Sequence, residues 1–272
     1  MIDLVGKIGS MALLNEERTD IDLDKFKKIG AYLRPGVIWV SSGAVEIGRI
    51  DYMSRAGCEL RGDMDDVKTD YAAQGQAILM QTYRSCIPAK YSVRQVLVEH
   101  QHYNNKAKRE HIRNLLLRAA AQNAVPIVNY NDAVSNEENR KLEIAALKQS
   151  NGKAAELVDN DETASQIARL VEAKNLLILT NVEGIYRDAG DPSTLIDTVT
   201  GGTAAEVLAR IDEIKAGCKG ASRAGAFGAA AKLEHIKPCI ERGVRVYIAS
   251  AKHDIGDILA GRVRCTRIGV GI

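Results

Sequence analysis

The sequence predicts an α/β fold, a three-layer αβα sandwich built around a mainly parallel central sheet. Several short runs of consecutive apolar residues are typical of strands that are buried on both faces. Longer segments with apolar residues at helical spacing lie between these runs along the chain. Strands that alternate with helices in this way favour a doubly wound sheet.

The expected strands share apolar side chains on consecutive positions, and they span residues 37–41, 95–98, 126–129, 175–180 and 244–249. The expected helices share apolar side chains three and four positions apart, and they span residues 70–83, 106–122, 162–173 and 229–242. In the second of these helices Ile112, Leu115, Leu116 and Ala119 stand at helical spacing. Gly243 follows the last helix and is a favourable place for it to stop.

Two further stretches carry neither pattern. Residues 132–160 are polar and rich in charge, and we expect a hairpin or a lid there. Residues 186–202 are similarly rich in Asp, Gly, Pro and Thr. Because the chain shows no internal repeat and no low-complexity tract, we expect residues 1–272 to form a single domain.

Composition and charge are those of an ordinary soluble enzyme. Apolar residues make up 46% of the chain and charged residues 26%. The formal net charge is +2, from 37 basic and 35 acidic residues, so there is no basic excess that would favour nucleic acid as a partner. We see no signal-peptide pattern and no apolar run of membrane-spanning length, and therefore expect a cytoplasmic protein.

Cysteine and histidine residues are scattered and do not indicate a disulfide framework. No CxxC pair is present, which fits reduced thiols at Cys58, Cys86, Cys218, Cys239 and Cys265. His100 and His102 are the one close histidine pair. They could share a strand face and hold a metal, but we favour solvated side chains in a polar loop.

Residues that follow the expected strands are the candidates for ligand binding, because doubly wound sheets bind ligands beyond the carboxyl ends of their strands. Residues 7–10 combine a lysine with a glycine and a serine, which suits an oxyanion. Residues 41–49 form a small, glycine-bearing entry to a helix, whose free amides suit a carboxylate or a phosphate. Either segment is also compatible with a plain surface turn.

Four later turns carry polar side chains of the same kind. Residues 129–135 offer Asn and Asp, which could bind a ligand or cap the next helix. Within residues 158–163, the three consecutive polar residues 159–161 carry two carboxylates, which is more than a helix cap requires. Residues 180–186 place a hydroxyl and an amide after a strand, and residues 220–232 run from Gly and Ala into a helix that carries Lys232. The Walker A pattern GxxxxGK[ST] does not occur. No single segment decides the function.

Taken together and in this order, these segments resemble the amino acid kinase family, and most closely its glutamate 5-kinase branch. The match covers nearly the whole chain. VSSGAV at 40–45 with Gly48-Arg49 is similar to the pattern VSSGA…GR, and AAQGQ at 72–76 with LMQ at 79–81 resembles AAVGQ…LMQ. VPIVNYNDAV at 125–134 is similar to VPIINENDAV. The DND pattern of the branch occurs unchanged at 159–161, and residues 176–186 resemble its pattern LLLLTDVDGLY.

This resemblance implies phosphoryl transfer from MgATP to a small carboxylate substrate, with L-glutamate as the expected acceptor and glutamyl 5-phosphate as the product, a step of proline biosynthesis. It implies catalytic roles for Lys7 and Lys232 beside the transferring phosphate, and for Asp161, which would hold both lysines. The acceptor would be bound by Ser42, Gly43, Ala44, Asp132 and Asn160. The nucleotide would be bound by Lys7, Gly9, Ser10, Thr180, Asn181, Tyr186, Ala226, Gly228 and Lys232. No residue is assigned as a protein ligand of Mg²⁺.

The resemblance also implies an organisation and a set of partners. Residues 1–160 would form an acceptor-binding lobe and residues 161–272 a nucleotide-binding lobe. The partners would be ATP and a small acid rather than nucleic acid or a membrane, in a homodimer or homotetramer. The PUA domain that follows the kinase domain in many members of the branch is not expected here.

Three positions depart from the pattern of the branch. Tyr130 stands where the NEND turn has a glutamate, and Asn181 stands where the TD turn has an aspartate. Phe227 lies where the backbone should approach phosphate. The acceptor is therefore open. The alternatives are UMP or another acid as substrate, or a nucleotide-binding homologue without catalysis.

Overall fold

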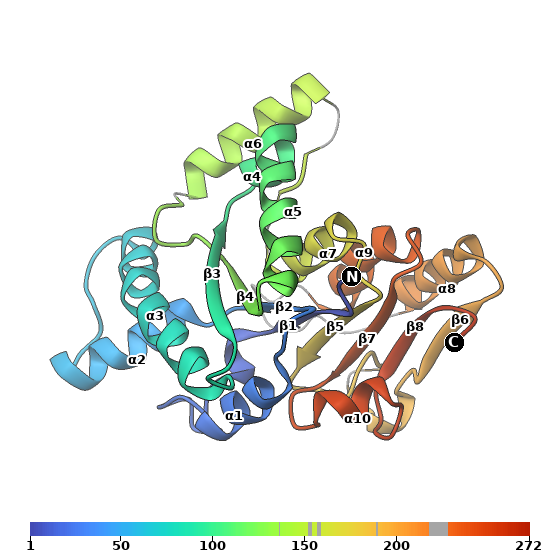
Figure 1. Cartoon of the computed structure of the whole chain (residues 1–272), viewed down its shortest axis with the longest axis horizontal. Coiled ribbons are helices and arrows are strands. Elements are labelled where there is room, and N and C mark those ends of the chain that lie inside the picture. Colours follow the sequence, from blue (N-terminus) through green and yellow to red (C-terminus); the bar gives the residue numbers. More distant parts are fainter. Residues whose placement is uncertain (136, 152–153, 157–158, 189, 218–227) are drawn as a thin grey trace. The chain divides into compact units, whose positions relative to one another are not determined.

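The structure is a computed structural model that describes residues 1–135, 137–151, 154–156, 159–188, 190–217 and 228–272 (Figure 1). The chain divides into two compact units. One consists of Met1–Ile8 and Asp161–Ile272, and the other of Gly9–Asn160. The first eight residues thus belong with the carboxy-terminal part of the chain. We call these units the lysine unit and the acceptor unit, after the candidate residues described below.

The described part of the lysine unit contains five strands, whose order is β1-β5-β7-β8-β6. These strands are β1 (Leu4–Ile8), β5 (Asn175–Thr180), β6 (Thr198–Gly201), β7 (Arg245–Ser250) and β8 (Thr266–Val270). The β1·β5, β5·β7 and β6·β8 pairs are parallel, and the β7·β8 pair is antiparallel. The helices of this unit are α7 (Asn160–Leu170, which begins one residue before the unit), α8 (Ala204–Gly217), α9 (Ala229–Ile240) and α10 (Ile255–Leu259), with the 3-10 helix η2 (Pro192–Thr194).

The acceptor unit contains the parallel strands β3-β4-β2, in that order. They span β2 (Val37–Ser41), β3 (Ser92–Val98) and β4 (Ala124–Tyr130). Strands β2 and β4 are buried at every position, whereas β3, at the edge of the sheet, is exposed at Ser92 and Gln95. The helices are α1 (Leu23–Tyr32), α2 (Ala44–Ala56), α3 (Met64–Cys86), α4 (Gln101–Asn104), α5 (Lys106–Ala121) and α6 (Glu137–Asn151), with the 3-10 helix η1 (Ser10–Ala12).

The predicted fold class is confirmed. Every strand and helix expected from the sequence is present, with ends that differ by up to six residues. Within the two units, the β1·β5, β2·β4, β3·β4, β5·β7 and β6·β8 pairs are parallel, and the β7·β8 pair is antiparallel. The apolar runs became strands because both of their faces are covered, as the fully buried strands β1, β2 and β4 show.

One regional prediction is wrong in part. About half of the polar stretch at 132–160 is the helix α6, where a hairpin was one of the two expectations. The other expectation, a lid, stays a prediction. Its sequence is rich in Glu, Lys, Ala and Leu, which are strong helix formers even where few apolar contacts are available. The spacing of apolar residues alone therefore does not predict this helix.

The prediction for His100 is also wrong. Its side chain is buried and not solvated, and its Nε2 atom lies 2.8 Å from an Oε2 atom of Glu143 on α6. His102 instead accepts a hydrogen bond at Nδ1 from the backbone N–H of Glu99, at 2.9 Å. The two rings thus have different local partners, and among the described residues no group of three or more His, Cys, Asp or Glu side chains is arranged to hold a metal ion.

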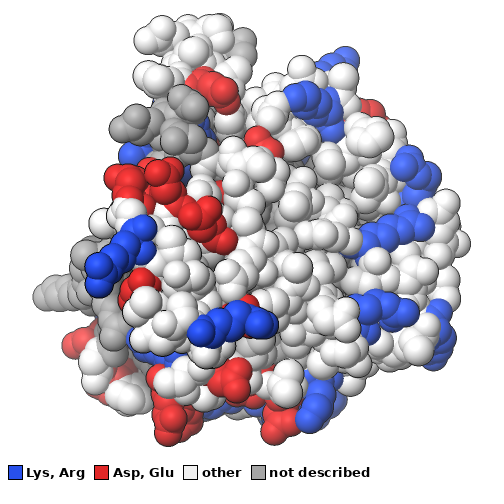
Figure 2. All heavy atoms as spheres, turned by 90° about the vertical axis from the view of Figure 1, so that its left-hand side faces the viewer, with Lys and Arg blue, Asp and Glu red and all other residues white. Residues whose placement is uncertain are grey.

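The surface carries both signs of charge. On the face drawn in Figure 2, the basic side chains stand singly or in small groups among uncharged residues, with acidic side chains between several of them. Within the part of the chain that the structure describes, no helix is long and apolar enough to cross a membrane.

Candidate active site

Two lysines from opposite ends of the sequence meet at one carboxylate in the lysine unit. Lys7 lies in β1, and its Nζ atom is 2.6 Å from Oδ1 of Asp161. Lys232 lies in the first turn of α9, and its Nζ atom is 2.6 Å from Oδ2 of the same carboxylate. Asp161 itself lies in the first turn of α7. The structure therefore brings together the three residues to which the resemblance gives catalytic roles.

Burial and charge set the electrostatics of this cluster. Burial by itself would raise the pKa of Asp161, but the ammonium groups of Lys7 and Lys232 lower that pKa to about 2. Asp161 is 1% exposed and remains ionised at neutral pH, whereas the Lys232 side chain is 23% exposed. One carboxylate faces two ammonium groups, so one positive charge is left over. A negatively charged ligand that reaches the lysines would supply the missing charge.

In the acceptor unit, a chain of side-chain hydrogen bonds connects residues near the carboxyl ends of β2 and β4. The amide nitrogen of Asn160 donates to Oγ of Ser42 at 2.9 Å and to Oδ1 of Asn129 at 3.1 Å. Asn129 in turn donates from Nδ2 to Oε1 of Gln76, at 2.8 Å. Among the described residues, Oδ1 of Asn160 and Nε2 of Gln76 are buried with no hydrogen-bond partner. Buried amide groups are normally satisfied, so these two atoms are an acceptor and a donor that a ligand could use.

The start of α2 lies next to this chain of hydrogen bonds. Gly43 precedes the helix with φ of +109°, a conformation that glycine adopts without strain. A Cβ atom at this position would lie 3.1 Å from Cδ1 of Leu13 and 3.8 Å from the Cα atom of Ser10. The N–H groups of the first turn, which begins at Ala44, have no partner within the helix, and Gly43 supplies no side-chain cap. They provide amide donors for a carboxylate.

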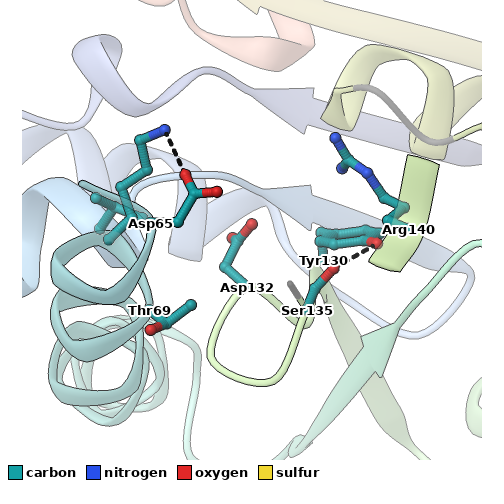
Figure 3. A pocket seen from close by; sticks show the side chains of 8 residues that line it. Asp65, Thr69, Tyr130, Asp132, Ser135 and Arg140 are labelled. Atoms are coloured by element: carbon teal, nitrogen blue, oxygen red, sulfur yellow. Dashed lines mark hydrogen bonds and ion pairs between the residues drawn. The ribbon is translucent and has the colours of Figure 1, made fainter. Parts of the chain in front are cut away.

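Asp132 lies in a pocket of about 100 Å³ within the acceptor unit. Val45, Asp65, Lys68, Thr69, Tyr130, Asp132, Ser135 and Arg140 line it. Figure 3 shows Asp132 between Asp65 and Thr69 of α3 on one side and Tyr130, Ser135 and Arg140 on the other. Burial raises the pKa of Asp132 to about 6, with a further rise from the Glu46 carboxylate and an opposing effect of Arg140. A smaller cavity of about 20 Å³ also borders Asp132, and Ala44 and Gln76 line it.

The residues that the resemblance assigns to the nucleotide are placed as follows. Gly9 precedes the 3-10 helix η1, which begins at Ser10, and both belong to the acceptor unit. Thr180 ends β5, where its Oγ1 atom donates to the carbonyl of Val182 at 2.8 Å and accepts from the N–H of Val182 at 3.0 Å. Asn181, in the same turn, is exposed.

The remaining nucleotide candidates lie farther along the lysine unit. Tyr186 forms an isolated β-bridge with Leu195. Gly228 is the residue before α9, and Lys232 lies in that helix. Ala226, together with Phe227, falls outside the described residues.

Sequence reasoning missed three residues of these sites. Gln76 and Asn129 were seen only as part of motifs, since nothing in a single sequence shows that the two amides bond to each other. Arg140 had no signal at all, because the segment that carries it was not expected to be helical. Its position in the pocket depends on α6, which follows β4 after a short turn.

The fold is that of an α/β protein, and its lysine unit places two amines on one buried carboxylate. Comparison with known proteins shows the family to which the chain belongs. The family model for the amino acid kinase family matches residues 4–250. Glutamate 5-kinase of Gloeobacter violaceus is 31% identical over 281 residues, covering 99% of this chain and 69% of that protein. Glutamate 5-kinase of Streptomyces avermitilis is 30% identical over 272 residues, covering 95% of this chain and 64% of that protein. The chain thus spans about two thirds of the length of these relatives.

A solved structure supports the fold. Carbamate kinase from Giardia lamblia, bound to AMP-PNP, superposes with a TM-score of 0.60 at 14% sequence identity, covering 99% of this chain and 98% of that one. The chain belongs to the amino acid kinase family. Its fold is the one expected from the sequence, and its family is a family of kinases.

Proposed function

We propose that this protein transfers the γ-phosphoryl group of ATP to the side-chain carboxylate of L-glutamate, giving glutamyl 5-phosphate and ADP for proline biosynthesis. The observation that carries the proposal is the cluster of Lys7, Asp161 and Lys232, with two amines on one buried carboxylate. The glutamate 5-kinases that are about 30% identical to the chain support the choice of acceptor.

In the proposed reaction, an oxygen of the acceptor carboxylate forms a bond to the γ-phosphorus while the bond from phosphorus to the bridging oxygen of ADP breaks. The carboxylate is already a nucleophile, so the step requires no general base. The difficulty is electrostatic, since an anion must approach a polyanion. Lys7 and Lys232 would offset this repulsion and the charge that develops on the phosphoryl oxygens, while Asp161 holds both amines in position.

The two units would divide the binding of the substrates. The acceptor unit would bind L-glutamate through Ser42, Asn160, Asp132 and the amides at the start of α2. The lysine unit would bind ATP, with the turn at Thr180 and the start of α9 as contacts. Mg²⁺ bound to the nucleotide would contribute positive charge at the phosphates. The cavity of about 100 Å³ in the acceptor unit favours a small acid over a nucleotide, since pockets for ligands of drug size begin at roughly 300 Å³.

The test is ADP release from MgATP with L-glutamate, L-aspartate, N-acetyl-L-glutamate and UMP as separate acceptors. Turnover that is highest with L-glutamate, with trapping of the acyl phosphate by hydroxylamine, is the expected result. Turnover with UMP alone would replace the proposal with a nucleoside monophosphate kinase. Binding of ATP without turnover on any of the four would indicate a nucleotide-binding homologue.

A further inference from the structure

We infer that Arg140, supported by the ring of Tyr130, recognises the second carboxylate of the acceptor, so that the acceptor is an α-amino acid bound by both of its α-substituents. This inference rests on the proposed function and adds a specificity-determining residue to it.

The pocket around Asp132 contains two positive and two negative side chains. Asp65 and Lys68, three residues apart on α3, form an ion pair of 3.5 Å between partly exposed groups. That pair accounts for one charge of each sign. The other two charges in the lining belong to Asp132 and Arg140.

Asp132 and Arg140 are not joined by an ion pair. Among the side chains that the structure describes, the Asp132 carboxylate has no hydrogen-bond or ion-pair partner, and Arg140 contacts the ring of Tyr130 but no carboxylate. The two still influence each other, because the positive charge of Arg140 opposes the rise in the pKa of Asp132. The pocket therefore presents a separate negative group and a separate positive group.

The Tyr130 ring explains how Arg140 is held without a carboxylate partner among the described side chains. The guanidinium carbon lies 5.7 Å from the centroid of the ring, within the range of a cation–π contact. Figure 3 shows Arg140 lying over Tyr130, whose hydroxyl is 3.0 Å from Oγ of Ser135. This hydrogen bond fixes the ring. A glutamate at position 130, as in the pattern of the glutamate 5-kinase branch, would instead place a carboxylate beside the guanidinium. With tyrosine there, the charge of Arg140 stays available to a ligand.

The two groups match the α-carbon end of an amino acid. An ammonium group would pair with Asp132, and an α-carboxylate would take two parallel N–H bonds from the planar guanidinium. An acid without the ammonium would leave Asp132 as a half-buried, unpaired anion. An acid without the α-carboxylate would leave Arg140 with the ring as its one contact among the described residues.

The experiment measures binding by titration calorimetry without nucleotide at pH 7.5, using L-glutamate, glutarate, 4-aminobutyrate and N-acetyl-L-glutamate. Glutarate lacks the ammonium, 4-aminobutyrate lacks the α-carboxylate, and N-acetylation removes the positive charge. We expect L-glutamate to bind at least about tenfold more tightly than each of the other three, since a hydrogen bond to a charged group contributes about a tenfold to hundredfold difference in affinity.

The variants are Arg140→Met, Arg140→Lys and Tyr130→Leu, with Lys141→Met as the control. Lys141 is exposed on the same helix and does not line the pocket, so its substitution removes one positive charge from outside the lining. Arg140→Met should weaken L-glutamate binding about 10- to 100-fold and leave 4-aminobutyrate binding unchanged. Arg140→Lys keeps the positive charge but loses the two parallel N–H donors of the guanidinium. Its affinity for L-glutamate should therefore lie between those of Arg140→Met and wild type. Tyr130→Leu should also weaken L-glutamate binding.

Equal losses of L-glutamate and 4-aminobutyrate affinity in Arg140→Met, or wild-type binding in that variant, would overturn the role of Arg140. Wild-type protein that does not prefer L-glutamate over 4-aminobutyrate would overturn it as well. The proposed kinase activity can fail separately, since the absence of ADP release would leave this pattern of binding intact. Circular dichroism spectra and melting temperatures of the variants separate lost recognition from misfolding.

Discussion

Asn160 and Asp161 are consecutive residues whose side chains belong to different candidate sites. Asn160 donates hydrogen bonds to Ser42 and Asn129 in the acceptor unit. Asp161 holds Lys7 and Lys232 in the lysine unit. The short DND segment thus links the residues proposed to bind the acceptor with the residues proposed to bind the transferring phosphoryl group. Predictions about the two functions can be tested by substitutions at adjacent positions.

Substituting either lysine should remove catalysis without preventing acceptor binding. Lys7→Met and Lys232→Met keep most of the side-chain length but lose the ammonium group. We expect kcat to fall by about 100- to 1000-fold in each variant, as for loss of one preorganised donor to a developing negative charge. The Kd of the acceptor should change less than threefold, because Lys7 and Lys232 lie outside the acceptor unit. Steady-state kinetics of ADP release, with calorimetry for the acceptor, measures both.

The control for these variants is Lys174→Met. Lys174 also belongs to the lysine unit, and it pairs with Asp3 at 3.1 Å, but both side chains are about half exposed. Its loss should leave kcat unchanged, since exposed pairs contribute little. Near-normal turnover in both Lys7→Met and Lys232→Met would show that the cluster is structural and has no catalytic role.

Replacing Asp161 should change the dependence of stability on pH. The pKa of this buried carboxyl is about 2 in the folded protein, below the ordinary value of 3.8. Its ionised form therefore stabilises the fold at every pH above about 4, and this contribution is lost as the pH falls from 4 toward 2. The shift corresponds to stabilisation on the order of 2 kcal/mol.

Asp161→Asn should accordingly be destabilised at pH 7 and at pH 5 by the same amount, with the difference from wild type shrinking below pH 4. Urea unfolding at pH 7, 5, 4 and 3 measures it. A difference that stays constant from pH 7 down to pH 3 would contradict an ionised Asp161 held by two ammonium groups.

Much of the fold could be predicted from the sequence because burial leaves a direct mark on it. Strands such as β2 and β5 are apolar at nearly every position because both of their faces are covered. They therefore appear in the sequence as runs of consecutive apolar residues. The short strand β6 and the strand β8 were missed. Strand β6, with the sequence TVTG, has one buried residue, and β8 is interrupted by the exposed Arg267, so neither forms an apolar run.

The candidate site was predictable only where several motifs agreed. Residues such as Lys7, Ser42 and Asp161 stand next to glycine or polar neighbours at strand ends and helix starts, and their order along the chain supplies the remaining information. Arg140 could not be found in this way. Its place in the pocket depends on which face of α6 points toward Tyr130, and the helix itself has little apolar periodicity.

Acceptor binding should weaken at acidic pH because of Asp132. The pKa of this carboxyl is raised to about 6, chiefly by burial. A protonated carboxyl cannot pair with an ammonium group, so kcat/KM for L-glutamate should be constant above pH 7 and fall about tenfold by pH 5. In Asp132→Asn the value should be low at all pH values and lack this transition. A pH profile of kcat/KM between pH 4.5 and 8.5 tests the expectation, and an unchanged transition in Asp132→Asn would assign the titration to another group.

The ionised carboxylate of Asp132 should lower the stability of the fold. An acid whose folded pKa lies above its unfolded pKa destabilises the fold when it ionises, so this cost is absent below about pH 4, grows as the pH rises to 6, and is constant above. Asp132→Asn should therefore melt at a higher temperature than wild type at pH 7.5 and at the same temperature at pH 4. Scanning calorimetry at both pH values decides it, and equal melting temperatures at pH 7.5 would mean that ionising Asp132 costs the fold nothing.

The packing of α2 on α3 should depend on two glycines that face each other. A Cβ atom on Gly48 would lie 1.8 Å from the carbonyl oxygen of Tyr71, and one on Gly75 would lie 1.9 Å from the carbonyl oxygen of Ala44. These atoms belong to the backbone, so the helices must move apart to admit a methyl group. Gly75→Ala should cost about 3 kcal/mol or more and displace the start of α2, where the amide donors proposed for the acceptor lie.

Gly217→Ala, at the end of α8, is the matched control, because a Cβ atom there meets nothing within 4 Å. We expect it to leave stability unchanged or to raise it by about 0.5 kcal/mol, through the loss of freedom in the unfolded chain. Urea unfolding of both variants, with acceptor binding measured at a temperature where each is folded, tests the coupling between the helix contact and the site. Gly75→Ala with wild-type stability would contradict the close approach of the helices. A destabilised Gly75→Ala that binds L-glutamate normally would show that the start of α2 does not set acceptor affinity, because the displaced amides are the ones proposed to hold the carboxylate.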